Sequence, residues 1–368
     1  MTQELETQEL ETKVLETLKT VMDPDLHKNI VSLGFVKNMK IEKGNVKFDV
    51  ELTTPACPVK EQLKNECETK VRQIGGVSHV EVNMTSSVRA TQSNQAVLPG
   101  VKNIIAVASG KGGVGKSTIS TNLALALSMT GAKVGLMDAD IYGPSIPKMM
   151  GIPITPPKGG PDNKFFPHEN HGMKVVSAGF LSKEGQPLML RGPMLGGIIQ
   201  QFLSNVEWGD LDYLVIDLPP GTGDVQLTLT QRAPLSGGVI VTTPQEVSLI
   251  DAEKGLRMFE QVKVPVLGVI ENMSYFVCDG CDKKHYIFKH GGGKALADQY
   301  KVPFLGEVPI VNAVVEGGDC GVPILLSNPD SPASQAYRKL AGQVAAQLSI
   351  NQANVEKVEP TFELSWKA

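Results

Sequence analysis

Apolar side chains in the first part of the chain recur first with helical and then with strand-like spacing. Within residues 5–22 they lie three or four positions apart, which places them on one face of a helix, and Asp23-Pro24 ends the pattern. The stretch 46–52 alternates apolar and polar residues and predicts a half-buried strand. The chain is therefore expected to begin with a helix followed by β-structure.

A second helix and a further strand complete this N-terminal pattern. Pro58 opens a helical pattern that runs through Ile74, because proline is tolerated at the first helical position, where its missing N–H has no partner. Residues 77–84, with the sequence VSHVEVNM, predict another strand that closes this unit. We expect a small α+β domain over residues 1–86, in the order α-β-β-α-β, followed by a linker at 87–100.

From position 101 the pattern changes to short, almost continuous apolar runs separated by helical segments. Strands of this kind are buried on both faces, which is typical of a parallel sheet covered by helices. We expect an α/β domain with a doubly wound, mostly parallel sheet over residues 101–350, then a polar tail at 351–368. The apolar runs are 104–109, 133–140, 213–219, 237–243, 264–273 and 303–309.

Composition and charge narrow the classes of function. With 368 residues, of which 41% are hydrophobic and 20% charged, the chain is long enough for two or three domains and a sizeable core. The net charge is −4, so the chain lacks the excess of basic residues that is typical of nucleic-acid-binding proteins. No apolar run approaches the roughly 18 residues of a membrane span. The acidic N-terminus is unlike a signal or transit peptide. We expect a cytoplasmic protein with reduced cysteines that binds neither nucleic acid nor membrane.

The segment 110–117, with the sequence GKGGVGKS, follows one of these apolar runs and precedes a helical pattern. Its spacing fits the phosphate-binding loop G-x-x-x-x-G-K-S/T, in which glycines let backbone N–H groups point at phosphate oxygens. Lys116 is expected to reach the β- and γ-phosphates of ATP, and Ser117 to bind Mg²⁺. The candidate nucleotide-binding residues of this segment are Gly110, Lys111, Gly112, Gly113, Val114, Gly115, Lys116, Ser117 and Thr118.

Acidic residues end two of the apolar runs. Asp217 precedes a Gly/Pro-rich turn, where it can accept a hydrogen bond from Mg²⁺-bound water or, alternatively, cap the turn. Asp138 and Asp140 end another run, and open α/β sheets collect their ligands at the carboxyl ends of the strands. A carboxylate in that place can orient or deprotonate an attacking water. These residues therefore predict an ATPase.

An additional lysine, Lys111, lies near the start of the loop, in the form KGGVGKS. In this respect the chain resembles the MinD/ParA/nitrogenase-reductase ATPases and their deviant Walker A motif. The resemblance implies a homodimer in which two chains meet over two ATP molecules and Lys111 reaches the nucleotide of the other chain, as an arginine finger does. It also implies that Asp140 positions the attacking water, that Asp217 and Asp224 belong to Walker B and switch II, and that Asn272 contacts adenine.

Within that family the chain is most similar to the Mrp/ApbC group of iron–sulfur cluster carrier proteins. The stretches 138–147, 272–281 and 287–293 resemble the switch I segment, the CxxC motif and the glycine-rich segment of that group, and 23–34 and 53–59 resemble its small N-terminal domain. The resemblance covers nearly the whole chain up to the tail. It implies a slow ATPase that carries a labile iron–sulfur cluster, with apo client proteins and cluster donors as partners.

Cys278 and Cys281 flank a turn-forming Asp-Gly pair, so both thiolates can face one point, but two sulfurs do not complete a tetrahedral site. From spacing alone we favour zinc bound by these cysteines with His285 and His290, because one chain then supplies all four ligands. The family resemblance implies instead a 4Fe-4S cluster held by four cysteines on the twofold axis of a dimer. With the resemblance taken into account, we favour the cluster.

The remaining cysteines have less definite roles. Cys57, at the start of the second helix, is expected either to have a pKa lowered by the helix N-terminus and to help pass the cluster, or to be a buried small side chain. Cys67 and Cys320 are expected to be structural, with Cys67 on the apolar face of its helix.

Two other functions share the phosphate loop. A spatial-organising ATPase of the MinD/ParA kind needs a basic surface or an amphipathic C-terminal helix, and the acidic sequence shows neither. An electron donor similar to nitrogenase reductase takes its cluster ligands from two separated cysteines rather than from a CxxC motif. Among these other functions, we keep a zinc-stabilised, spatial-organising ATPase as the alternative to a cluster carrier.

Overall fold

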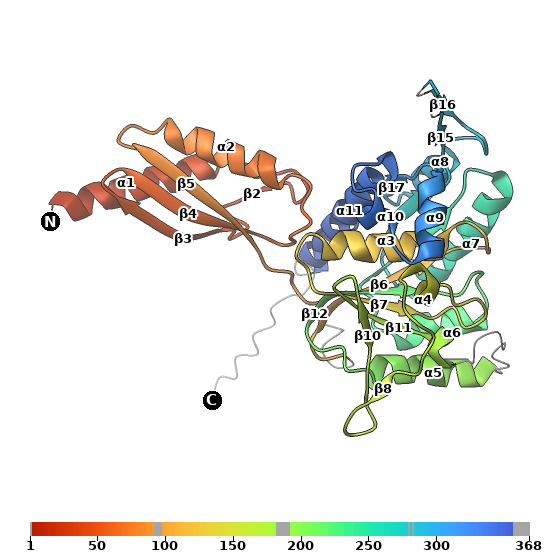
Figure 1. Ribbon diagram of the computed structural model, residues 1–368. Helices are drawn as coiled ribbons and strands as arrows, with labels where there is room; N and C mark the ends of the chain where they lie inside the picture. The colour runs from red at the N-terminus through yellow and green to blue at the C-terminus, as the bar shows by residue number, and fades with distance from the viewer. Residues whose placement is uncertain (1, 92–97, 182–191, 279, 282, 356–368) are drawn as a thin grey trace, which may run out of the picture. The chain divides into compact units, whose positions relative to one another are not determined.

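The computed structural model divides the chain into two compact units, Met1–Arg89 with Ala345–Ala368, and Ala90–Val344 (Figure 1). Parts of the predicted linker and tail lie outside the described residues, and residues 351–355 continue the last helix. Among the helices that are described, none combines the length and apolarity needed to cross a membrane. The structure describes residues 2–91, 98–181, 192–278, 280–281 and 283–355.

The N-terminal unit has the predicted α+β architecture. Strand β4 lies between β3, with which it is antiparallel, and β5, with which it is parallel. Helices α1 and α2 pack together and bury Leu18 and Leu63 against the apolar face of the sheet, which includes Phe48. The elements are α1 (Thr2–Leu18), β1 (Met22–Asp23), β2 (Lys28–Asn29), β3 (Val36–Glu42), β4 (Asn45–Leu52), α2 (Lys60–Arg72) and β5 (His79–Ser86).

Two helix boundaries differ from the prediction. Helix α1 ends at Leu18, and buried Val21 belongs to the segment that leads into β1 rather than to the helix. Helix α2 begins at Lys60, two residues after Pro58, so the prediction that this proline opens the helix is wrong. The amide of Leu63 donates to the carbonyl oxygen of Val59 at 2.9 Å, which makes Val59 the capping residue and leaves the proline in the preceding turn.

The second unit is an α/β domain with helices flanking a mostly parallel sheet, as predicted (Figure 1). The strand order is β10-β11-β7-β12-β6-β13-β14-β17, and all neighbours are parallel except β10 and β11. The sheet strands are β6 (Val101–Ala108), β7 (Val134–Asp138), β10 (His168–Asn170), β11 (Met173–Ser177), β12 (Leu211–Asp217), β13 (Gly237–Thr242), β14 (Val266–Glu271) and β17 (Phe304–Glu307).

Helices surround this sheet and position the loops at its carboxyl edge. Helix α3 packs on β6, β7 and β12, α7 packs on β13 and β14, and α8 packs on β14 and β17. The helices are α3 (Lys116–Ser128), α4 (Ile146–Met149), α5 (Gly192–Ser204), α6 (Asp224–Arg232), α7 (Glu246–Gln261), α8 (Gly292–Tyr300), α9 (Asn312–Cys320), α10 (Ile324–Ser327) and α11 (Pro332–Val355). Short hairpins add β8 (Lys158–Gly159) with β9 (Phe165–Phe166), and β15 (Phe276–Val277) with β16 (Lys284–His285).

Each of the six predicted apolar runs contains a strand of this sheet. Every residue of β7 and β13 is buried, β6, β12 and β14 are buried except for one residue each, and the edge strand β17 is mostly half-buried. Strands β10 and β11 extend the sheet beyond β7 and were not among the predicted runs. The carboxyl ends of β7, β12 and β14 bring Asp138, Asp217 and Asn272 to the edge where the phosphate loop lies.

Candidate functional site

The predicted phosphate loop connects the central strand β6 to helix α3. Gly113 and Gly115 have φ angles of 84° and 81°, in the left-handed region that glycine adopts readily. A Cβ atom on Gly115 would overlap the side-chain amide of Asn272, and one on Gly110 would overlap the backbone of Asp251 on α7. The glycines are therefore required both by the backbone path and by the close approach of neighbouring elements.

Lys116 and Ser117, at the start of α3, both contact the carboxylate of Asp217 at the end of β12. The Lys116 side chain is 6% exposed, and its Nζ lies 2.7 Å from Asp217 Oδ2 and 3.9 Å from Asp140 Oδ2. Ser117 Oγ donates to Asp217 Oδ2, and Ser120 Oγ, one helical turn later, donates to Oδ1, both at 2.6 Å. The loop lysine, the loop serine and the strand-end carboxylate thus converge on one point.

Asp138 lies beside Asp217, because the two residues are partners in the parallel pairing of β7 and β12. Asp138 accepts hydrogen bonds from Ser177 Oγ at 2.9 Å and from the amides of Asp140 and Ile146. Burial, followed by the negative charge of Asp217, raises the pKa of Asp138 to about 8. Burial also raises the pKa of Asp140, whereas Lys116 opposes that shift. The site therefore holds several carboxylates around one lysine.

The raised pKa of Asp138 makes the stability of this unit depend on pH. The ordinary pKa of the group is 3.8 and its folded value is about 8, so between these values the folded chain binds more protons than the unfolded chain. The free energy of unfolding should therefore fall by a few kcal/mol as the pH rises from about 4 to about 8. We expect Asp138→Asn to flatten this dependence in calorimetric scans. The exposed control Glu169→Gln should keep it, and an unchanged slope in Asp138→Asn would contradict the assignment.

Two adjacent residues at the end of β14 connect the phosphate loop to the segment that carries the CxxC motif. Asn272 Nδ2 donates to the carbonyl oxygen of Val114 in the loop at 2.8 Å. The buried carboxylate of Glu271 accepts hydrogen bonds from Ser274 Oγ at 2.6 Å and from the amides of Gly291 at 3.1 Å and Gly293 at 2.6 Å. Glu271 thus holds both ends of the segment that contains the cysteines, and its neighbour Asn272 contacts the phosphate loop.

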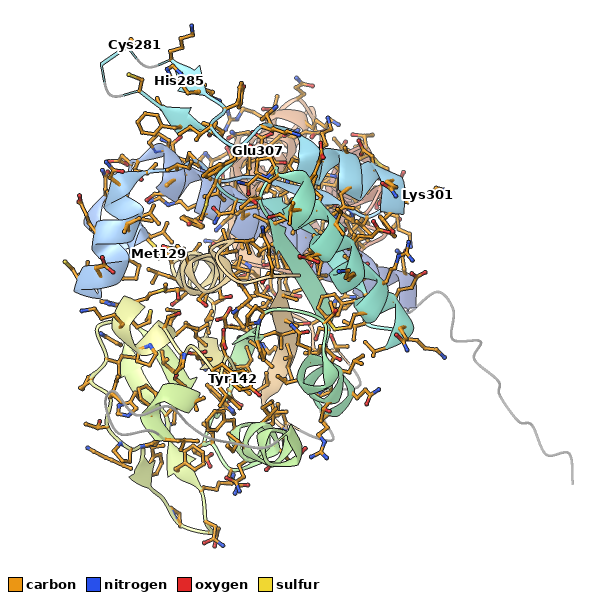
Figure 2. All side chains as sticks on the ribbon, turned by 90° about the vertical axis from the view of Figure 1, so that its right-hand side faces the viewer. Met129, Tyr142, Cys281, His285, Lys301 and Glu307 are labelled. Carbon is orange, nitrogen blue, oxygen red and sulfur yellow. The ribbon has the colours of Figure 1, made fainter. Side chains whose placement is uncertain are left out.

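The cysteine motif lies at the tip of the hairpin formed by β15 and β16. Figure 2 shows Cys281 and His285 at the end of this hairpin, which projects beyond the sheet, with Glu307 nearer the body of the domain. The ligand atoms of Cys278, Cys281 and His285 all lie within 4.8 Å of one another. Cys278 is half-buried, and Cys281 is exposed. The hairpin therefore brings three side chains suited to a transition metal into one cluster.

His290 does not belong to that cluster, so the predicted four-ligand zinc site within one chain is wrong. Its Nε2 lies 3.0 Å from Glu307 Oε1, and it forms a separate group with Glu307 and Glu271. Strand β16 ends at His285, whereas His290 lies in the segment between this strand and α8.

The expectation that Cys320 is structural is wrong, and one of the two alternatives for Cys57 is favoured. Burial raises the pKa of the Cys57 thiol to about 11, which favours a buried small side chain over a thiol activated by the start of α2. Cys320, at the end of α9, is exposed and does not contribute to a core. Cys67 is buried on the apolar face of α2, as predicted.

The remaining candidates surround the loop. Lys111 is half-buried, and its carbonyl oxygen accepts a hydrogen bond from Ser109 Oγ at 3.0 Å. Thr118 is in the first turn of α3, where its carbonyl oxygen accepts a hydrogen bond from Asn122 Nδ2. Asp224 is the first residue of α6, and its side chain lies outside the described part of the structure.

Sequence analysis missed three residues of this site: Ser120, Ser177 and Glu271. Ser120 follows Ser117 by three positions and so shares its face of α3, a spacing that the sequence does show. Glu271 is an acidic residue at the end of an apolar run and next to Asn272, which is again a visible signal. Ser177 could not have been found, because its contact with Asp138 depends on the pairing of β11 with β7.

Comparison with known proteins identifies the family. A family model described as NUBPL iron-transfer P-loop NTPase matches residues 100–345, and one described as iron–sulfur cluster assembly protein matches residues 11–84. The chain belongs to the iron-transfer P-loop NTPases. Within this family, the iron–sulfur cluster carrier protein of Synechocystis sp. is 49% identical over 339 residues, which cover 90% of this chain and 96% of that protein.

Two other proteins that are similar to this iron-transfer NTPase are a second cluster carrier and a nucleotide-binding protein of known structure. The iron–sulfur cluster carrier protein of Escherichia coli is 42% identical over 334 residues, covering 90% of each chain. A nucleotide-binding protein from Archaeoglobus fulgidus, solved in complex with ADP and with cobalt found in it, is 40% identical with a TM-score of 0.58. That similarity covers 67% of this chain and 96% of the archaeal one.

Proposed function

We propose that this protein is a slow ATPase that binds a labile 4Fe-4S cluster at a homodimer interface and transfers it to apo-proteins. The observation that carries the proposal is the pair Glu271-Asn272. One of these residues binds the phosphate loop, and the other anchors the segment with the CxxC motif. A change at the nucleotide can therefore be transmitted to the cysteines through neighbouring residues of one strand.

The geometry of the phosphate loop supports a role for each polar residue around it. Lys116, now paired with Asp217, would turn to the β- and γ-phosphates, and Ser117 would bind Mg²⁺ directly. Asp217 would then hold a Mg²⁺-bound water. Asp140 lies close enough to Lys116 to share the γ-phosphate region, and it would orient the attacking water. The charge of the magnesium ion would offset the buried carboxylates.

Exposed apolar side chains beside the loop support the homodimer. Gly110 touches the backbone of Asp251 on α7, and Val247 and Ile250 on that helix are 64% and 57% exposed. Tyr142, two residues after Asp140, is 66% exposed (Figure 2). A second chain that covered these side chains would bury apolar area and bring its own Lys111 toward the nucleotide. Thr118 and Asn272 would contact the ribose and adenine side of the same ATP.

The cluster would be shared between the two chains. Each chain offers two thiolates at the tip of one hairpin, and two such hairpins supply the four sulfurs of a cubane cluster. A cluster held at an exposed interface is easily released, which suits a carrier. ATP binding, by ordering the segments that follow Asp140 and Asp224, would change the interface and with it the exposure of the cluster.

The test is the metal content and oligomeric mass of the full-length protein after anaerobic reconstitution with iron and sulfide. We expect about two irons and two sulfides per chain in a dimer, as one shared cubane requires. Transfer to an apo-ferredoxin should then change with added ATP. The proposal fails if the dimer retains zinc that iron and sulfide do not displace, because the cysteines would then be structural.

A further inference from the structure

The N-terminal unit contains a cavity of about 340 Å³ whose lining residues all belong to this unit. Its volume lies in the range of small-molecule pockets, about 300–1,000 Å³. The stretches 23–34 and 53–59, which resemble the small domain of cluster carriers, both contribute to its wall. Neither stretch takes part in the phosphate loop or the cysteine motif, so the cavity points to a role for them that the proposed function does not include.

Two basic side chains line the cavity, Lys28 on β2 and Arg89 at the end of this part of the chain. No aspartate or glutamate is among its described lining residues. Asp23 pairs with Lys28 across β1 and β2, but it is buried and its Oδ1 accepts hydrogen bonds from the amides of Asp25 and Leu26 at 2.9 and 2.8 Å. The cavity thus has a positive charge that no lining carboxylate neutralises, and it favours an anion.

Ser32 and Thr53 bring hydroxyl groups to the same cavity. The amide of Ser32 donates to Asn29 Oδ1 at 2.8 Å, which holds the turn after β2 and so fixes this serine relative to Lys28. Within the described residues, the side chains of Lys28, Ser32 and Thr53 form no hydrogen bond or ion pair with the protein. Arg89 makes other contacts, but the five N–H donors of a guanidinium allow it to bind an anion as well.

The lining also includes apolar side chains that are firmly held. Phe35 is 3% exposed, its amide donates to the carbonyl oxygen of Ile30 at 2.9 Å, and its carbonyl oxygen accepts from the amide of Glu51 at 2.8 Å. Leu26 and Leu33, which line the cavity as well, are half-buried. A ligand with an apolar part would remove that part from water against these side chains, which favours binding.

A carboxylate suits this lining better than a phosphate. The guanidinium of Arg89 can hold either group through two parallel hydrogen bonds. Phosphate sites commonly add the N–H groups and positive partial charge of a helix N-terminus. Here the helical part of the wall, Ser349 and Gln352, lies far along α11 from its start at Pro332, so that contribution is missing. Two side-chain cations with hydroxyl groups and apolar surface therefore favour a singly charged organic acid.

We propose that this cavity binds a small carboxylate with an apolar body. The carboxylate lies between Lys28 and Arg89, and the apolar body lies against Leu33 and Phe35. A free organic acid and the C-terminus of a partner polypeptide offer this same chemistry. Because Lys28 and Arg89 are exposed, the ligand enters from solvent and rising salt weakens its binding. Binding requires neither the nucleotide nor the cluster of the proposed function.

The test is calorimetric titration of the full-length protein with sodium hexanoate, hexanol and inorganic phosphate at low ionic strength. We expect saturable binding of one hexanoate per chain, at least about tenfold tighter than phosphate, and no binding of hexanol at the same concentrations. Equal binding of hexanol and hexanoate, or tighter binding of phosphate, would overturn the carboxylate site.

A second titration identifies the source of the carboxylate. A short peptide that ends in leucine with a free carboxylate is compared with the same peptide amidated at its C-terminus. If the peptide acid binds more tightly than hexanoate and the amide does not bind, the ligand is a chain end. If hexanoate binds and neither peptide does, the ligand is a free acid. Equal binding of the peptide acid and its amide would contradict recognition of a carboxylate.

Two lysine variants make a matched pair. Lys28→Gln should weaken hexanoate binding at least about tenfold, because it removes a cation from the cavity. Lys37→Gln, which changes an exposed lysine on β3 outside the cavity, should bind hexanoate as the wild type does. Arg89→Lys keeps the charge but loses the two parallel donors, so it should weaken binding by a smaller factor. Equal affinities of Lys28→Gln and Lys37→Gln would remove this inference.

The outcome is independent of cluster binding and of ATP hydrolysis. Lys28→Gln should hydrolyse ATP and accept iron and sulfide as the wild type does, and its equilibrium unfolding should be unchanged because Lys28 is exposed. A protein that accepts a cluster but does not bind hexanoate would keep the proposed function and lose this site. A protein that binds hexanoate as described but never accepts a cluster would do the reverse.

Discussion

Lys116→Ala is expected to reduce ATP hydrolysis about 100–1,000-fold, because it removes a cation aimed at the charge that develops on the transferred phosphoryl group. It should also destabilise the ATPase unit. Lys116 is almost fully buried, with Asp217 2.7 Å away, and its loss leaves that carboxylate buried without its cation. Removing one partner of a buried ion pair costs about 3–5 kcal/mol.

Steady-state hydrolysis, nucleotide affinity and thermal unfolding would measure both effects. Lys164→Ala is the matched control, since Lys164 forms an ion pair of similar length, 2.9 Å, with Glu207 but is 46% exposed. An exposed pair contributes at most about 1 kcal/mol, so this control should unfold and hydrolyse ATP much as the wild type does. Near-normal hydrolysis in Lys116→Ala would remove the phosphate loop from the mechanism.

Cys278→Ser is expected to lower the iron and sulfide content of the reconstituted dimer at least about tenfold, because a hydroxyl is a poor ligand for iron–sulfur clusters compared with a thiolate. Nucleotide binding should remain, since the hairpin projects beyond the sheet that carries the phosphate loop (Figure 2). The loss should appear as the disappearance of the broad visible absorption of the cluster.

Cys320→Ser is the control for this change, because Cys320 is an exposed thiol on α9, outside the hairpin. It should leave iron, sulfide and nucleotide binding unchanged. A normal cluster in Cys278→Ser would defeat the model of a cluster bridged by this motif.

The fold of the second unit could be predicted because most of its strands can be recognised from their own residues. A run such as 237–243 is buried on both faces, and burial of this kind requires a continuous apolar sequence. The strand order could not be read, since it depends on which runs pair across the sheet. Strand β11 could not be predicted, because a segment of five residues that includes a lysine has no apolar pattern that distinguishes it from a loop.

Prediction of the site succeeded where the chemistry is local and failed where it depends on packing. The loop at 110–117 is one contiguous segment, so its sequence contains its geometry. For Cys57 the sequence left two alternatives open, and the structure favours burial, because desolvation raises the pKa of its thiol more than the backbone hydrogen bond at Val59 lowers it. His290 was grouped with the cysteines on spacing alone, whereas the fold places it beside Glu307.

The anchoring of the cysteine segment has a consequence for how such a protein can change over evolutionary time. Ser274 lies near the start of this segment and Gly291 near its end, and both are held by the single carboxylate of Glu271. The residues between them can then lengthen, shorten or be exchanged without shifting the register of β14 or the start of α8. Selection can therefore alter what is carried while the nucleotide chemistry stays as it is.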